Sequence, residues 1–151
     1  MKISIIYVKQ NKSKNAESFE QHFLNKLEKN NSIKMIPISI KKKFNSRALQ
    51  IEEEGKAIWK QLNHKEELIC FDKSGETMSS EKFSQIFYRE GININLIIGG
   101  AFGLSEDIKK MANKIISFSD MEFSHEVFRV MLLEQLYRAN CIFFNHPYHQ
   151  N

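Results

Sequence analysis

The chain has 151 residues, of which 42% are hydrophobic and 26% are charged. These values are ordinary for a globular protein, and we expect one domain over residues 1–151. With only six glycines and two prolines, the chain is not collagen-like or a low-complexity linker. The first apolar run, residues 1–8, is too short for a signal peptide or a membrane span, and we therefore expect a cytoplasmic protein.

The net charge of +4 is unevenly distributed along the chain. Residues 1–75 carry 15 lysines and arginines against 9 acidic residues, whereas residues 76–151 carry 7 against 9. Several basic residues of the first half fall in predicted loops or at the ends of predicted elements: Lys9, Lys12, Lys14, Lys41, Lys42, Lys43 and Arg47. They could neutralise RNA phosphates, although a solvated surface explains the same pattern.

The first half of the chain alternates strand-like and helix-like patterns. Residues 2–8 predict a strand, and apolar residues at helical spacing between 16 and 27 predict a helix that stops before Asn30. Residues 32–40 predict a second strand. After a basic turn, the apolar stripe from 48 to 62 predicts a second helix.

The second half continues this alternation. Residues 67–72 predict a third strand and residues 73–76 a turn at Gly75, before a helix that Ser79 or Ser80 caps and that ends at Gly91. Two further strands are predicted at 93–98 and 114–118, and a last helix at 125–139. The alternation of strands and helices predicts an α/β fold.

Two cysteines, Cys70 and Cys141, lie in apolar stretches and have no partner at metal-site spacing. We therefore expect two buried free thiols in a reducing compartment. The pair His146 and His149 lacks a further ligand and would make a poor zinc site. The sequence predicts no metal site.

A glycine-rich loop, residues 99–103, follows the fourth predicted strand and precedes a helix that Ser105 caps. Glycines lack a Cβ atom, so their backbone can approach a ligand closely. The loop has neither the G-x-G-x-x-G nor the P-loop spacing, which disfavours those two kinds of nucleotide site. A tight turn between strand and helix explains the glycines equally well.

The last predicted helix is apolar on nearly every face, although it carries Arg129, Glu134 and Arg138. A helix of this kind is buried on more than one side, and in so small a chain the second side indicates a homodimer interface. Glu134 and Arg138 are four residues apart and can pair along the helix.

The tail over residues 145–151 gathers two of the five histidines, a proline and Tyr148. Histidine exchanges protons near neutral pH and tyrosine can stack on a base, so the tail suits chemistry on an RNA base. A frayed terminus is the alternative explanation.

Four blocks of the chain resemble the SPOUT-class methyltransferases of RlmH type, which methylate N3 of a pseudouridine in bacterial large-subunit ribosomal RNA. The blocks are residues 96–105 around the glycine loop, residues 117–125, residues 129–139, and the sequence NHPYH at 145–149. They occur in family order and at family spacing, and the resemblance covers the whole chain.

The resemblance implies an α/β SPOUT fold with a mostly parallel sheet, helices on both faces and a C-terminal trefoil knot. It also implies a homodimer, ribosomal RNA as partner and S-adenosylmethionine as cofactor. The implied cofactor site consists of Phe71, Gly99, Gly100, Gly103, Phe118, Ser119, Asp120, Met121, Glu122 and Phe123. The implied target-base side, with some groups from the partner subunit, consists of His125, Arg129, Glu134, Arg138, Tyr148 and His149.

The chain departs from the family pattern at three places. Ser124 stands where a proline is usual, but serine caps a helix equally well. Gln150 stands where a basic residue is frequent, which would remove one phosphate contact. Ala101 and Phe102 replace a commoner polar pair, so we expect a changed contact with cofactor or RNA there.

The expected chemistry needs no metal, because the sulfonium methyl group is already activated and the protein has only to align donor and acceptor. Tyr148 and His149 are predicted to position the base and to assist its deprotonation, with Glu134 or hydroxide as alternatives. Two other functions fit part of the pattern. One is a non-catalytic ribosome-binding protein of the same fold, against which the intact glycines and tail argue, and the other is a flavodoxin-like nucleotide or flavin protein.

Overall fold

A computed structural model describes the whole chain except residues 11, 12, 43, 90 and 151, so the predicted phosphate contacts of Lys12 and Lys43 lie outside the described residues. Strands and helices alternate from end to end, as the sequence predicts. The strands are β1 (Lys2–Val8), β2 (Ser32–Ile38), β3 (Glu67–Glu76), β4 (Asn93–Ile98) and β5 (Lys114–Ile116). The helices are α1 (Lys14–Leu27), α2 (Arg47–Gln61), α3 (Ser80–Phe87), α4 (Glu106–Met111) and α5 (His125–Phe143).

The strands form one sheet in the order β2-β1-β4-β3-β5, and every neighbouring pair is parallel. A parallel sheet requires a crossover after each strand, and helices supply these crossovers. The central strands are apolar on both sides, since all but the first residue of β1 and of β4 are buried. Pro37, which cannot donate a ladder hydrogen bond, lies in the edge strand β2.

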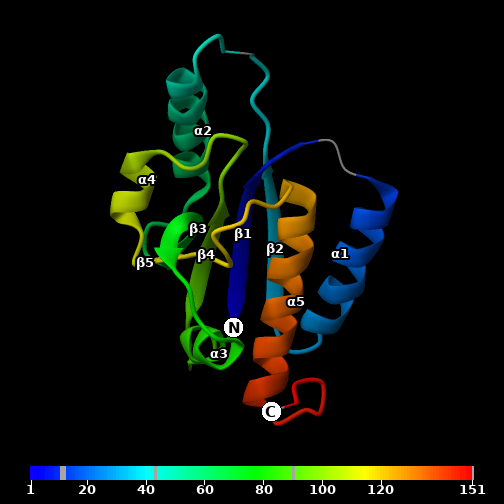
Figure 1. Cartoon of the computed structure of the whole chain (residues 1–151). Helices are drawn as coiled ribbons and strands as arrows, with labels where there is room; N and C mark the ends of the chain where they lie inside the picture. Colours follow the sequence, from blue (N-terminus) through cyan, green and yellow to red (C-terminus); the bar gives the residue numbers. More distant parts are fainter. Residues whose placement is uncertain (11–12, 43, 90, 151) are drawn as a thin grey trace.

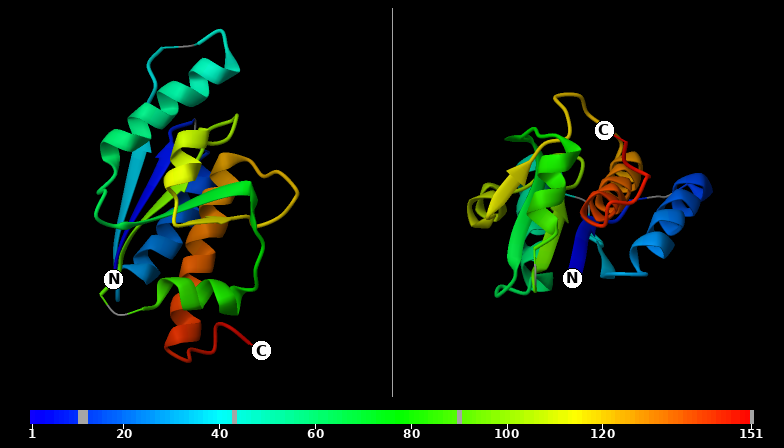
Figure 2. Two further views of the ribbon diagram at one scale, coloured as in Figure 1. Left: turned by 90° about the vertical axis from the view of Figure 1, so that its left-hand side faces the viewer. Right: turned by 90° about the horizontal axis from the view of Figure 1, so that it is seen from below.

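Helices cover both faces of the sheet (Figures 1 and 2). Helices α1, α3 and α5 bury Leu27, Phe83 and Leu132 in the core on one face. Helices α2 and α4 bury Ile58 and Ile108 in a second core on the other face. This arrangement confirms the α/β prediction and the mostly parallel sheet with helices on both faces, whereas the trefoil knot stays a prediction.

The prediction of a turn at residues 73–76 is wrong. Strand β3 continues to Glu76, which pairs with Ile116 of β5 after a shift in register. A Cβ atom on Gly75 would lie 2.6 Å from the backbone carbon of Ile115. The glycine therefore permits two strands to approach closely and does not form a turn.

Several predicted element ends also differ from the structure. Strands β2 and β5 each end two residues earlier than predicted. Helix α3 ends at Phe87 instead of Gly91, because the backbone leaves helical geometry at Tyr88, where ψ is 74°. Helix α5 continues a further turn to Phe143, where no glycine or proline interrupts it.

Both cysteines, Cys70 and Cys141, are buried and free, as predicted. Among the described residues, no helix combines the length and the hydrophobicity that crossing a membrane requires.

Helix α5 runs along the sheet from the carboxyl ends of the parallel strands to their amino ends (Figure 1). Its first residues lie near the carboxyl ends of β1 and β4, and its last turn lies near the amino ends, where the tail folds back and contacts α3.

Candidate active site

The glycine loop lies at the carboxyl end of β4, between that strand and α4. Gly103 has a φ of +86°, and its N–H donates to the carbonyl oxygen of Gly100 at 3.0 Å. A Cβ atom on Gly99 would lie 2.9 Å from the backbone carbon of Gly103, so the loop closes tightly on itself. Ser105 caps α4 by accepting a hydrogen bond from the N–H of Ile108 at 3.3 Å, which confirms that prediction.

A cavity of about 410 Å³ opens above this loop, and we call it the glycine-loop cavity. That volume is within the usual range for small-molecule sites. Nine residues of the predicted cofactor set line it: Phe71, Gly99, Gly100, Gly103, Phe118, Ser119, Met121, Glu122 and Phe123. Asp120 belongs to the same segment but does not line the cavity. Residues that are far apart in the sequence thus meet at one place.

Aromatic side chains form one wall of the glycine-loop cavity. The ring of Phe118 lies 5.5 Å from that of Phe71 and 4.9 Å from that of Phe128, measured between centroids. Phe128 lines the cavity from α5, whereas its sequence pattern indicated only an apolar helix. Such a wall suits a flat or apolar ligand group.

Charged side chains border the same cavity. The guanidinium of Arg47 lies over the ring of Phe102 at 4.7 Å, and Lys73 pairs with Glu122 at 2.9 Å. Burial disfavours the ionised form of Asp72, but hydrogen bonds from Ser74 and nearby lysines outweigh it and lower its pKa. The cavity therefore has an apolar wall and a rim that carries both signs of charge.

His125, from the predicted target-base set, lines the glycine-loop cavity at the first residue of α5. Burial lowers the pKa of its imidazole, and the charge of Arg129 lowers it further, against a hydrogen bond with the backbone of Gly99. A neutral imidazole therefore faces the cavity near pH 7. Ser124 caps the helix as expected, accepting a hydrogen bond from the N–H of Val127.

Arg129 lies one turn further along α5 and is 1% exposed. Its Nε donates to Oε1 of Glu20 in α1 at 2.7 Å, and its guanidinium lies over the ring of Tyr7 at 4.7 Å. In this chain Arg129 joins α5 to α1 and β1. Arg129 is near enough to His125 for its charge to lower the pKa of that imidazole, but its contacts do not join it to the other four residues of the predicted target-base set.

The remaining four residues of that set meet at the far end of α5, and we call Glu134, Arg138, Tyr148 and His149 the tail cluster. Glu134 accepts hydrogen bonds from Arg138 at 2.5 Å and from the Tyr148 hydroxyl at 2.9 Å, which confirms the predicted pairing of Glu134 with Arg138. Nδ1 of His149 lies 3.3 Å from Nη1 of Arg138, and its Nε2 lies 2.9 Å from Oε1 of Glu81 in α3. Both ring nitrogens of His149 are therefore engaged.

The tail cluster holds its groups in defined protonation states. Burial and the hydrogen bond to Glu134 raise the pKa of Tyr148, and the bond to Glu134 raises the pKa of Arg138. At neutral pH the cluster therefore presents a phenol and a guanidinium cation. Other N–H groups of the guanidinium can donate hydrogen bonds to a base, and the phenol oxygen, whose proton is held by Glu134, can accept one.

The glycine-loop cavity and the tail cluster lie at opposite ends of α5. His125 and Arg138 are 13 residues apart on this helix, which separates them by about 20 Å along its axis. A cofactor in the cavity of one chain would be out of reach of that chain's own tail cluster.

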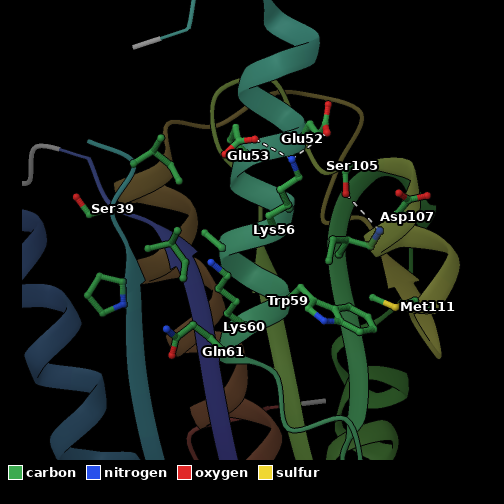
Figure 3. A pocket seen from close by; sticks show the side chains of 16 residues that line it. Ser39, Glu52, Glu53, Lys56, Trp59, Lys60, Gln61, Ser105, Asp107 and Met111 are labelled. Carbon is green, nitrogen blue, oxygen red and sulfur yellow. Dashed lines mark hydrogen bonds and ion pairs between the residues drawn. The ribbon is translucent and has the colours of Figure 1, made fainter. Parts of the chain in front are cut away.

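A second cavity, of about 760 Å³, lies between the end of β2 and helices α2 and α4 (Figure 3). Trp59 and Met111 border it, and its Lys56 pairs with Glu52 and Glu53 at 3.1 and 2.9 Å. It contains no residue of the predicted site. We therefore place the candidate site at the glycine loop, although the second cavity is larger.

Sequence reasoning missed two acidic neighbours of the site. Glu81 contacts His149 from α3, and Glu54 of α2 lies against Gly100. Neither has a local signal, because each contact joins segments that are far apart in the sequence. Across the described residues, no group of three or more His, Cys, Asp and Glu side chains could hold a metal ion.

Known proteins resemble this chain over nearly its whole length. Residues 1–149 match the family described as predicted SPOUT methyltransferases. Over 99% of this chain and 100% of the relative, the chain is 35% identical to a ribosomal RNA large subunit methyltransferase H from Clostridium botulinum.

Solved structures show the same fold. A probable methylase family protein from Haemophilus influenzae superposes with a TM-score of 0.61 at 11% identity, over 99% of this chain and 70% of its own. A protein from Legionella pneumophila, solved with the cofactor SAM bound, superposes with a TM-score of 0.54 at 12% identity, over 92% of this chain and 66% of its own.

Proposed function

Because the chain belongs to the SPOUT methyltransferase family, we propose that it transfers a methyl group from S-adenosylmethionine to N3 of a pseudouridine in large-subunit ribosomal RNA. The observation that carries the proposal is the glycine-loop cavity, which gathers nine of the ten residues expected at the cofactor. The relative from Clostridium botulinum is named for ribosomal RNA, which supports the same class of substrate. We further propose one domain over residues 1–151 and a cytoplasmic location.

The glycine-loop cavity fits this cofactor in size and in chemistry. Gly99, Gly100 and Gly103 present backbone without side chains, and the wall of Phe71 and Phe118 suits the flat adenine ring. The bound cofactor supplies an activated methyl group. The residues of the chain bind it, orient it and exclude water around it.

We propose that two chains combine to complete the active site. A two-fold dimer with the α5 helices packed against each other in opposite directions would place the tail cluster of one chain at the glycine-loop cavity of the other. Large apolar side chains at the cavity end of the molecule are exposed, since Met121, Phe123 and Val127 are 74%, 37% and 47% accessible. A partner chain would cover this surface.

The tail cluster would then hold the target base beside the methyl donor. Its guanidinium can donate hydrogen bonds to the base and its phenol oxygen can accept one, which together fix the orientation of the base. Because both nitrogens of His149 are engaged and Tyr148 remains a phenol, these residues position the base. The N3 proton would then leave to solvent hydroxide, and no metal takes part.

Basic residues around the carboxyl edge of the sheet would supply affinity for the RNA backbone. Lys9, Lys41 and Lys42 lie at or beyond the ends of β1 and β2, and they are exposed. Arg47 follows in the same region and lines the cavity. Lysine and arginine neutralise phosphates without reading sequence, so they would bring the RNA to the cavity without selecting the base.

The direct test is methyl transfer from labelled cofactor to ribosomes that lack the modification, with isothermal titration of S-adenosylmethionine and of FMN in parallel. Transfer with S-adenosylmethionine binding supports the proposal. Cofactor binding without transfer would indicate the non-catalytic ribosome-binding alternative, and FMN binding alone would indicate the flavodoxin-like one.

Mixed dimers test the shared site. One chain would carry Gly100→Val, which should block cofactor binding, and the other Tyr148→Ala with His149→Ala. Each pure dimer should be inactive. In the mixed dimer the intact tail cluster of the first chain meets the intact cavity of the second, so one of the two sites should be active. No activity in a mixed dimer that forms normally would mean that each site belongs to one chain.

A further inference from the structure

A buried carboxyl group lies behind the glycine loop. Glu54, in the middle of α2, is only 4% exposed. Its Oε1 accepts a hydrogen bond from Nε2 of Gln50 at 2.7 Å, while its Oε2 is buried and has no hydrogen-bond partner among the described residues. The proposed mechanism does not use this group.

Glu54 fills the space where residue 100 would carry a side chain. A Cβ atom built on Gly100 would lie 2.5 Å from Oε2, 2.7 Å from Oε1 and 2.9 Å from Cδ of Glu54. Real Cβ atoms essentially never approach other atoms this closely. The glycine therefore makes room for a side chain of the protein itself.

The next residue of α2 packs against the loop region in the same way. A Cβ atom on Gly55 would lie 2.8 Å from Oγ of Ser105, the residue that caps α4. The pair Glu54 and Gly55 thus contacts both Gly100 and the start of α4. Helix α2 supports the glycine loop from the side that faces away from α5.

Stability does not account for a carboxyl group at this place. Burying a carboxyl with one oxygen unpaired costs free energy, which an apolar side chain would not. Burial raises the pKa of Glu54, and the hydrogen bond from Gln50 only partly opposes it. The group is therefore held in an unfavourable environment, directly behind a residue that lines the cavity.

We propose that Glu54 is a positioning residue for cofactor binding: its carboxyl group supports the backbone at Gly100 and so sets the shape of the cavity wall. The inference rests on the proposed function only in taking S-adenosylmethionine as the ligand. Glu54 acts through the loop and does not line the cavity itself. The side chain cannot swing aside freely, because it is buried and bonded to Gln50.

A double-mutant cycle tests this contact, with Gly100→Ala, Glu54→Ala and both together, measured by titration of S-adenosylmethionine. Gly100→Ala should weaken binding by about tenfold, a usual strength for coupled neighbours. Glu54→Ala should weaken it less, because only the support is lost. The double variant should bind no worse than Glu54→Ala alone, since the new methyl group then has space.

Glu54→Gln and Glu53→Ala are the matched controls. Glutamine keeps the volume behind Gly100 without the charge and should bind the cofactor nearly as well as the natural chain. Glu53 precedes Glu54 on α2 and pairs with Lys56 near the surface, so its loss should leave cofactor affinity unchanged. Circular dichroism and the melting temperature of each variant without cofactor separate folding from binding.

Two results would overturn the proposal. If Gly100→Ala weakens the binding of S-adenosylmethionine by the same factor in the natural chain and in Glu54→Ala, the cofactor itself needs the glycine. If Glu54→Ala binds S-adenosylmethionine like the natural chain, Glu54 does not position the loop. Failure of the natural chain to bind S-adenosylmethionine is a different outcome, which would remove the proposed function and this inference with it.

Discussion

The two ends of helix α5 carry different kinds of site. At its first turn lies a cavity with walls of glycine backbone and aromatic rings, beside His125. At its last turns lies the tail cluster, in which an ion pair and several hydrogen bonds hold charged and polar groups in direct contact. The first can admit a small molecule, and the second can orient a group that approaches it. A methyl transfer needs both, which is why one chain by itself is an incomplete enzyme in our proposal.

Arg129 lies between the two ends and should have the largest effect on stability. Removing one side of a buried ion pair costs about 3–5 kcal/mol, so Arg129→Ala should destabilise the fold by that order, because the buried carboxylate of Glu20 loses the hydrogen bond from Nε of Arg129. Urea denaturation measures the loss. Arg89→Ala is the control, because Arg89 is half exposed where it pairs with Glu67 and such a pair contributes about 1 kcal/mol or less.

The opposite result would change the assignment of this residue. If Arg129→Ala kept its stability but lost affinity for ribosomes, Arg129 would belong to the RNA-binding groups, as the family resemblance implies. It would then have to leave the contact with Glu20 when RNA binds.

The tail cluster should dominate turnover. Tyr148→Ala with His149→Ala should lower turnover by about 10²-fold, the scale expected when the reacting base is misplaced by about 1 Å, while the Kd for S-adenosylmethionine stays unchanged. Methyl transfer and titration measure the two quantities separately. His64→Ala, an exposed histidine that contacts Trp59, should change neither. Full turnover in the tail variant would remove the cluster from the active site.

Local features of the fold were predictable from the sequence. The order of strands and helices, the serine caps at Ser105 and Ser124 and the pairing of Glu134 with Arg138 all depend on residues within a few positions of each other. The glycine loop was also predicted, but the sequence suggested only two reasons for its glycines, the close approach of a ligand or a tight turn. The structure adds a third reason, the carboxyl group behind Gly100.

Contacts between distant segments were not predictable. Glu20 and Arg129 are 109 residues apart, and Glu81 and His149 are 68 apart, so no local pattern relates them. The same reason explains the wrong turn at Gly75, because the strand that this glycine accommodates comes some 40 positions later in the chain. Hydrophobic periodicity shows that a residue is buried but does not identify its partner.

The basic residues at the carboxyl edge should affect binding without affecting turnover. Each phosphate contact contributes about 0.9 to the salt slope on a duplex and somewhat less on single strands, so Lys41→Ala with Lys42→Ala should flatten the slope by up to about two units. Ribosome binding at several salt concentrations measures it. Lys29→Ala with Lys65→Ala, exposed lysines near the opposite edge, should leave the slope unchanged. An unchanged slope in the first variant would mean a merely solvated surface.

The smallest expected effect concerns His125 at the cavity end of α5. Burial lowers the pKa of its imidazole below the ordinary value of 6.5, so the unfolded chain takes up a proton more readily than the folded one. The contribution of this group to stability is therefore complete above about pH 6.5 and decreases as the pH falls toward its folded pKa. Urea denaturation at pH 8 and pH 5.5 should show a loss at the lower pH that is reduced in His125→Gln and retained in His64→Gln. An equal loss of stability in both variants would mean that His125 titrates as an exposed histidine does. It would contradict the conclusion that a neutral imidazole faces the glycine-loop cavity.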